Sequence, residues 1–202
     1  ARMTLSRRRF LTIAAALPLA GSLRSPDRVE WHGDALGGSA HIVLDGPRDA
    51  TEAALAEVAA EIDRLENLFS LHRPEAQLAR LNSAGTLDAP ARDLLATLHR
   101  AEYWHARTEG AFDATIQPLW TALARGTALP ARAASPGPVL APHRLALAPG
   151  TALTLNGIAQ GTIADRVADL LARRGFAAPL IDTGEMQLPG PDYRRVTLPR
   201  AG

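Results

Sequence analysis

The sequence predicts an α+β fold in which a cluster of helices packs on an antiparallel or mixed sheet. Three observations predict it: strand-like alternation near residues 28–46, successive helical patterns over residues 49–108, and a strand–turn–helix–strand pattern over residues 152–184. Because the helices follow one another and do not alternate with strands, this class is favoured over a doubly wound parallel sheet. With 202 residues, 47% of them hydrophobic, the chain can bury a real core in one domain or one and a half.

Two short strands are predicted first, "RVEWHG" at residues 28–33 and "SAHIVLDG" at residues 39–46. A bend at Gly37 and Gly38 separates them, and apolar residues alternate with polar neighbours in the second strand. The pair therefore reads as a hairpin at the start of the fold.

The strongest helical pattern follows in "DATEAALAEVAAEIDRLENLFS", residues 49–70. Asp49 and Glu52 resemble a capping box at its start. Its apolar residues step by three and four, as on the buried face of a helix: Leu55, Val58, Ile62, Leu65 and Phe69. A second, short helix is predicted for "PEAQLARLN", residues 74–82.

A longer helix is predicted for residues 90–108, with Pro90 at its first position. The segment "GAFDATIQPLW", residues 110–120, is bounded by glycine and proline and is interpreted as a turn. Residues 126–150 contain many of the prolines and are expected to form a surface connection with at most one short strand.

The last pattern places a strand at residues 152–156, a helix at 161–175 and a strand at 177–184. Gly157 and Gly161 lie where the first strand would turn into the helix. Such a turn can hold a phosphate, because free backbone N–H groups and the positive end of the helix point at the anion.

A purely structural interpretation of this turn stays open. Glycine can simply allow a tight strand-to-helix connection, with Asn156 as the N-cap. A dinucleotide-binding Rossmann turn is disfavoured because it needs G-x-G-x-x-G, and here the first glycine spacing differs, although Asp182 does end the following strand. A Rossmann-like oxidoreductase is therefore the least favoured function.

The amino-terminal segment "SRRRFLTIAAALPLAGS" has the order of a twin-arginine export signal: a basic region, a short apolar run and small residues. The apolar run is shorter than the ~20 residues that a membrane-spanning helix needs, and Pro18 interrupts it. We therefore expect residues 1–25 to be a signal peptide and residues 28–202 to form a domain in the periplasm. No stable membrane span is expected after the signal is removed.

Composition excludes several classes of function. The net charge is only +1 and aromatic residues make up 4% of the chain, which argues against nucleic acid as a partner. The absence of cysteine excludes disulfides, thiolate chemistry and a cysteine-linked lipid anchor. The six histidines are dispersed, without H-x-H or H-x-x-x-H pairs, so a zinc site built on them is not expected.

Four stretches, in this order, resemble the FAD:protein FMN transferases of the ApbE family. They are "ALGGSAHIVL", "EIDRLENLFSLHRPEAQLARLN", "TEGAFDATIQPLW" and "LTLNGIAQGTIADRVADLLARRGFAAPLIDTGE". The resemblance spans residues 30–190 and implies an ApbE-like, T-fold-type architecture. It also implies that FAD and Mg²⁺ are bound, that the diphosphate of FAD is cleaved, and that FMN is attached to a threonine of a partner flavoprotein.

The resemblance implies a flavin-binding role for five residues of the first three stretches. Leu36 falls in the family's Met-Gly-Thr segment and would line the flavin pocket. His72 falls on an aromatic position and can still stack, although with less area than tyrosine. Ala111, Phe112 and Asp113 match the family's "AFD" segment, which contacts FAD.

Three further residues are implied in the last stretch. Thr154 replaces an acidic or polar residue at the end of the key strand. Gln160 replaces the usual Lys or Glu of the turn, and it is neutral but still able to hydrogen-bond FAD. Gly157 occupies a position whose oxygen helps to hold Mg²⁺, so that only its carbonyl could serve.

The family continues beyond the position of Gly202 and supplies there an Asp and a Thr that ligate the metal, so the domain is expected to be partial. Phosphoryl transfer rests mainly on metal ions and positioning, and this chain is therefore expected to be weakly active or inactive. The alternative function is a periplasmic protein of the same fold that binds or carries FAD without catalysis.

Overall fold

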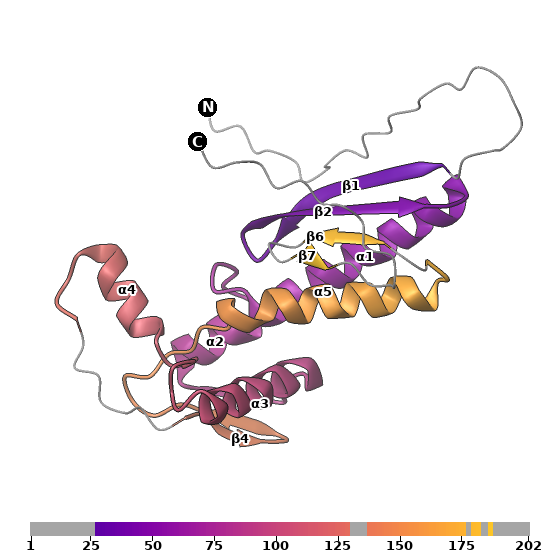
Figure 1. Ribbon diagram of the computed structural model, residues 1–202. Coiled ribbons are helices and arrows are strands. Elements are labelled where there is room, and N and C mark those ends of the chain that lie inside the picture. The colour runs from indigo at the N-terminus through magenta and orange to yellow at the C-terminus, as the bar shows by residue number, and fades with distance from the viewer. Residues whose placement is uncertain (1–26, 130–136, 177–178, 183–185, 188–202) are drawn as a thin grey trace, which may run out of the picture. The chain divides into compact units, whose positions relative to one another are not determined.

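The computed structural model describes residues 27–129, 137–176, 179–182 and 186–187 (Figure 1). The described residues divide into two compact units, one made of those up to residue 61 and from residue 164 onward, the other of those between residues 62 and 163. Helices α1 (Arg48–Phe69) and α5 (Asn156–Arg173) contribute to both units. Each unit combines helices with an antiparallel sheet, which confirms the predicted α+β class. The expected signal peptide lies outside the described residues.

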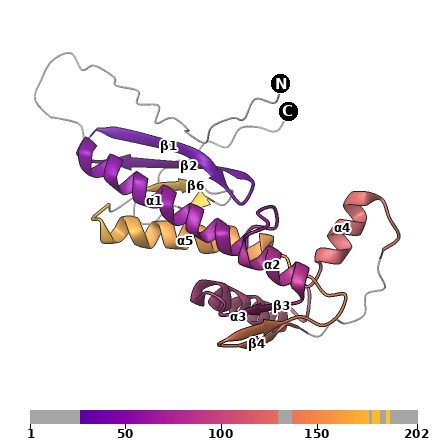
Figure 2. The same cartoon turned by 180° about the vertical axis from the view of Figure 1, so that it is seen from behind.

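The first unit contains a four-stranded antiparallel sheet in the order β1-β2-β6-β7. Its strands are β1 (Arg28–Ala35), β2 (Gly38–Asp45), β6 (Leu180–Asp182) and β7 (Met186–Gln187). Within this unit, α1 and α5 lie along one face of the sheet, as Figures 1 and 2 both show. The residues that fill the space between are almost fully buried: Val29, Ala40, Ile42, Leu44, Leu55, Val58, Val167, Leu171 and Ile181.

The predicted hairpin is confirmed, with its turn one residue earlier than expected. Leu36 and Gly37 form a two-residue loop with φ values of 51° and 84°. Positive φ at both positions is typical of a type I′ turn, whose twist matches that of the strands. Glycine adopts this conformation without a steric penalty, whereas at Leu36 the positive φ strains the backbone.

Helix α1 begins one residue before the predicted start, at Arg48. The predicted capping box is wrong, because Asp49 lies inside the first turn and Glu52 instead accepts a hydrogen bond from Arg48 Nε at 2.9 Å. Thr51 Oγ1 donates to the Pro47 carbonyl at 2.9 Å. The far end of α5 is joined to α1 by an ion pair between Arg174 and Glu57.

The second unit contains a three-stranded antiparallel sheet in the order β3-β5-β4. Its elements, besides the shared helices, are α2 (Gln77–Ala84), β3 (Thr86–Asp88), α3 (Arg92–Arg107), α4 (Gln117–Arg125), β4 (Val139–Ala141) and β5 (Arg144–Ala146). Its core consists of leucines and other large apolar residues that are at most 3% exposed: Leu65, Phe69, Leu78, Leu81, Leu87, Leu94, Leu98, Leu145, Leu153, Leu155 and Ile163.

Several predicted boundaries in this unit are wrong. Helix α4 replaces the last four residues of the turn predicted over residues 110–120, with Pro118 in its first turn, where no backbone donor is needed. Helix α3 begins at Arg92, so Pro90 precedes the helix and is not its first residue. The connection over residues 126–150 contains two strands, β4 and β5, because β5 pairs with both β3 and β4 to form the sheet.

The strand predicted at residues 152–156 is also wrong, because this segment forms only one isolated bridge, between Ala152 and Ile116. Helix α5 then begins at Asn156, so Gly157 and Gly161 lie inside its first turns.

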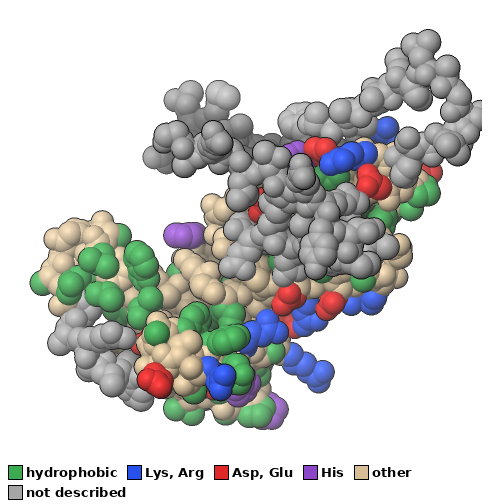
Figure 3. Space-filling model, viewed as in Figure 1, with side chains coloured by type: hydrophobic (Ala, Val, Ile, Leu, Met, Phe, Trp, Pro, Cys, Tyr) green, Lys and Arg blue, Asp and Glu red, His purple; other side chains and the backbone are tan. Residues whose placement is uncertain are grey.

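The surface over α4 is apolar in the view of Figure 3, where hydrophobic side chains gather. Trp120 and Leu123 of α4 are 58% and 54% exposed. Among the described residues, no helix combines the length and the apolar character that crossing a membrane requires.

Candidate functional site

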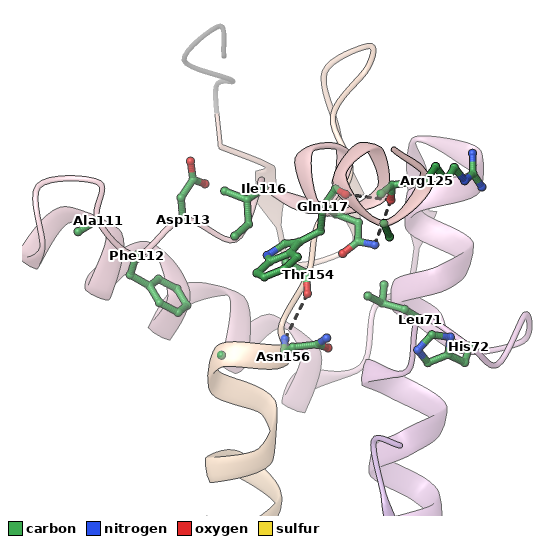
Figure 4. A pocket seen from close by; sticks show the side chains of 14 residues that line it. Leu71, His72, Ala111, Phe112, Asp113, Ile116, Gln117, Arg125, Thr154 and Asn156 are labelled. Atoms are coloured by element: carbon green, nitrogen blue, oxygen red, sulfur yellow. Dashed lines mark hydrogen bonds between the residues drawn. The ribbon is translucent and has the colours of Figure 1, made fainter. Parts of the chain in front are cut away.

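A cavity of about 690 Å³ lies within the second unit (Figure 4). Its walls come from the segment after α1, the loop between α3 and α4, helix α4 itself and the start of α5. Six of the sequence-predicted site residues line it: His72, Ala111, Phe112, Asp113, Thr154 and Gly157. Cavities of this size and mixed lining are typical of sites for cofactors and other small molecules.

Hydrogen bonds hold both backbone polar groups of Phe112, its N–H and its carbonyl. The Phe112 N–H donates to Thr108 Oγ1 at 2.9 Å. The Phe112 carbonyl lies 2.9 Å from His105 Nδ1. Because a carbonyl oxygen only accepts, the Nδ1 of His105 must carry the proton in this bond. Helix α3 thus fixes the backbone from which the Phe112 ring projects.

Asp113 has a structural role in the turn before α4. Its Oδ1 accepts hydrogen bonds from the backbone N–H of Thr115 at 2.8 Å and from Thr115 Oγ1 at 2.7 Å. This turn stabilises the chain just before α4 begins. Within the part of the chain that the structure describes, Oδ2 accepts no hydrogen bond, so one carboxylate oxygen remains for a ligand.

The start of α5 is tied to the same loop. The Thr154 N–H donates to the Ala114 carbonyl at 2.8 Å, and Thr154 Oγ1 accepts from the Asn156 N–H at 3.4 Å. The N–H groups of Ile158 and Ala159 both donate to the Leu155 carbonyl. The Gly157 N–H has no acceptor among the described residues, and it lies at the positive end of the helix.

Gly157 also lies close to the Phe112 ring. A β-carbon at this position would lie 3.2 Å from Phe112 Cε2, which is tighter than most contacts of real β-carbons. The φ of Gly157 is not positive, so the need here is for space and not for backbone freedom. Of the structural explanations for this glycine, close packing is therefore the one that holds.

With this geometry in place, comparison with known proteins identifies the family. The family model described as ApbE matches residues 36–198, which is most of the chain. This chain belongs to the ApbE family. A relative named FAD:protein FMN transferase, from Treponema pallidum (strain Nichols), is 30% identical over 160 residues, which are 68% of this chain and 44% of the relative.

Two solved ApbE structures share the fold. The flavin transferase ApbE from Vibrio cholerae matches with a TM-score of 0.70 and 22% identity, over 82% of this chain and 60% of that one. The apo form of the flavinyl transferase ApbE from Pseudomonas stutzeri matches with a TM-score of 0.72 and 24% identity, over 84% and 63%. The chain thus spans less than half of the curated relative and less than two thirds of these structures.

Two of the residues implied by the ApbE resemblance are not among those that line the cavity. Leu36 belongs to the hairpin turn of the other unit. Gln160 lies on α5, three residues after Gly157, and its side chain is half-buried. A flavin-binding role for both stays a prediction.

Other lining residues were missed by sequence reasoning, among them Trp120 and Arg125 of α4 and Asn156 of α5. Trp120 belongs to the quoted ApbE-like stretch, and its exposed indole adds a flat apolar surface to the cavity that Phe112 and His72 also line. Arg125 adds a positive charge, and within the described residues it makes no ion pair. The helical periodicity of residues 117–125 was the sequence pattern that could have placed Trp120 and Arg125 on one helix.

Asn82 of α2 positions the segment that leads into the cavity. Its side-chain nitrogen donates to the Leu153 carbonyl at 2.8 Å, and its side-chain oxygen accepts from the Leu153 N–H at 2.7 Å. Leu153 is fully buried and immediately precedes Thr154, so these two bonds satisfy backbone groups that water cannot reach. The amide thus replaces the strand pairing that the sequence predicted for this segment.

We expect Asn82→Ala to lower the free energy of unfolding by about 1–3 kcal/mol, because it leaves the buried N–H and C=O of Leu153 without partners. Urea unfolding followed by circular dichroism measures this difference. Ser83→Ala is the matched control, since Ser83 is the exposed neighbour on the same helix. Equal stability of the two variants would contradict the role of Asn82.

Proposed function

We propose that this chain carries the FAD-binding site of an FAD:protein FMN transferase, which moves FMN from FAD to a threonine of a partner flavoprotein. Its ApbE family membership and the name of its Treponema relative support the proposal. The single observation that most directly supports it is the cavity of the second unit. Its lining combines flat aromatic side chains, the guanidinium of Arg125 and the start of α5.

Each part of this lining suits one part of FAD. The rings of Phe112 and Trp120 and the imidazole of His72 offer flat surfaces on which an aromatic ring system stacks. The Gly157 N–H at the start of α5 and the guanidinium of Arg125 suit a diphosphate, because both favour negative charge. FAD unites such rings and such a diphosphate in one molecule.

The cavity lining also offers oxygens of the kind that Mg²⁺ takes in proteins, where its ligands are one or two carboxylates together with phosphate oxygens and water. Asp113 Oδ2, Thr154 Oγ1 and the Gly157 carbonyl are the candidate ligands from this chain. The Gly157 carbonyl would use the lone pair that the helical hydrogen bond leaves. When bound, the ion would neutralise charge that develops on the diphosphate.

The proposed transfer conserves all atoms of FAD and of the acceptor. The hydroxyl oxygen of the acceptor threonine bonds to the phosphorus of the FMN half, the diphosphate bridge breaks, AMP leaves, and the hydroxyl proton is released. The residues of this chain bind and orient FAD, so that the phosphorus faces the acceptor. No described residue is assigned as the base.

The test is incubation of the chain with FAD, Mg²⁺ and a threonine-bearing flavoprotein acceptor, followed by mass spectrometry of the acceptor. We expect the mass of one FMN to be added, and none when EDTA is present or the threonine is replaced by valine. Quenching of flavin fluorescence measures FAD binding in the same samples. Binding without transfer would favour the non-catalytic carrier of the same fold, and absence of FAD binding would refute both functions.

We also propose that the protein acts in the periplasm, because its first 25 residues have the order of a twin-arginine signal. Replacing Arg7 and Arg8 together by lysine is expected to leave the precursor in the cytoplasm. Cell fractionation and immunoblotting measure the distribution, and Arg24→Lys is the control outside the basic region. Unchanged accumulation in the periplasm would contradict export by this route.

A further inference from the structure

Two histidines and a glutamate meet on the outer face of the hairpin in the first unit. His32 of β1 and His41 of β2 are paired directly across the two strands. Glu30 lies two residues before His32, and in a strand such residues share a face. The neighbours on the opposite face, such as Ile42, are buried, so the cluster is on the side away from the core.

The three side chains already converge. The imidazoles of His32 and His41 are stacked, with ring centroids 4.2 Å apart and an angle of 6° between their planes. Glu30 Oε2 lies 3.8 Å from His32 Nε2 and 3.4 Å from His41 Nε2. The other carboxylate oxygen, Oε1, pairs with Arg28 Nε at 3.4 Å, which orients the group.

The Nε2 atom of His41 lacks a hydrogen bond. It is shielded from solvent, and within the residues that the structure describes no donor or acceptor is aligned with it. The contact with Glu30 is close enough for an ion pair but does not have the geometry of a hydrogen bond. A shielded ring nitrogen of this kind needs a partner, and a metal ion would supply one.

We propose that Glu30, His32 and His41 form a binding site for a divalent transition-metal ion, with Zn²⁺ as the best match. The candidate ligand atoms all lie within 4.8 Å of one another. A tetrahedral ion with bonds of about 2.1 Å holds its ligand atoms about 3.4 Å apart, which is close to the separations seen here. To bind one ion, the two stacked rings must tilt so that both Nε2 lone pairs point at it.

The ligand types select the metal. Two imidazoles and one carboxylate suit Zn²⁺, Cu²⁺ or Ni²⁺, whereas Mg²⁺ prefers an all-oxygen set. Three protein ligands leave a fourth position for water. Because the ligands come from both strands, the bound ion would join β1 to β2 and stabilise the hairpin. The site shares no residue with the cavity of the second unit.

The test is titration of the metal-free chain with Zn²⁺ by calorimetry and with Co²⁺ by visible absorption. We expect one ion per chain, a Co²⁺ spectrum of a four-coordinate site, and a higher melting temperature with Zn²⁺. Glu30→Gln, His32→Gln and His41→Gln should each lower the affinity at least about tenfold, since loss of an outer-shell partner alone costs about 10–100-fold.

His99→Gln is the matched control, because His99 also lies beside a carboxylate, 3.3 Å from Glu102, but has no third candidate ligand among the described residues. It should bind Zn²⁺ like the unmodified chain. If a variant at Glu30, His32 or His41 fails to fold, NMR of the histidine rings in the unmodified chain tests the proposal instead. Zn²⁺ should then shift the signals of His32 and His41 alone. Equal affinity in all variants, or equal shifts of all histidines, would overturn the proposal.

Discussion

Gly157→Val is expected to abolish FAD binding while the chain remains folded. A β-carbon at this position already meets the Phe112 ring at 3.2 Å, and the two methyl groups of valine would push that ring into the cavity that both residues line. The helix itself should persist, because valine is no worse than glycine in a helix and the buried face of α5 is unchanged.

The measurement is thermal unfolding with and without FAD and Mg²⁺. At a ligand concentration of 100 Kd, binding stabilises the unmodified chain by about 2.7 kcal/mol, or roughly 5–10 °C for a chain of this size. We expect Gly157→Val to lose this shift and to keep its melting temperature without ligand. Ala172→Val is the control, since it adds the same side chain at an exposed position of α5. A destabilised variant that still shifts with FAD would assign Gly157 to packing alone.

Asp113→Ala is expected to weaken both FAD binding and the fold. The substitution removes the oxygen that accepts two hydrogen bonds from Thr115, which should lower the free energy of unfolding by about 1–3 kcal/mol. It also removes the carboxylate from the cavity, which should cost a further ~1–3 kcal/mol of binding free energy, or about 5–150-fold in affinity.

Asp113→Asn separates the two roles. Asparagine keeps an oxygen that accepts from Thr115 but has no charge, so we expect nearly normal stability and reduced affinity for FAD with Mg²⁺. Thr115→Val is the complementary control, because it removes one of the two hydrogen bonds and leaves the carboxylate in place. Urea unfolding and flavin fluorescence quenching measure the two quantities. Normal FAD affinity in Asp113→Asn would show that the charge has no part in binding.

Long periodic segments were predictable from the sequence because their pattern depends only on neighbours along the chain. Helix α1 starts one residue from its predicted position, and the first hairpin forms as expected. Helix α4 was missed for two reasons: it has only nine residues, and it contains a proline soon after the "AFD" turn. In a single sequence, a proline more often indicates a turn or the end of a helix.

The residues of the candidate site were predictable only in part. His72, Phe112 and Thr154 are far apart in the sequence. They were assigned to one site because of the family resemblance and not because of their spacing. Their cavity also takes Trp120 and Arg125 from α4, a helix that was not predicted from the sequence. The strand predicted before Gly157 does not form, because its backbone groups find partners elsewhere, in the Asn82 side chain and the Ala114 carbonyl.

The histidines show most clearly which features could be predicted from the sequence and which required the tertiary structure. By itself the sequence determined the α+β class, the main helices and the hairpin, since these follow from periodicity and turn residues. It also led to the expectation that no zinc site is built on dispersed histidines. Only the tertiary structure decided that His32 and His41 are neighbours: the register of an antiparallel pair brings together residues nine positions apart and puts them on one face.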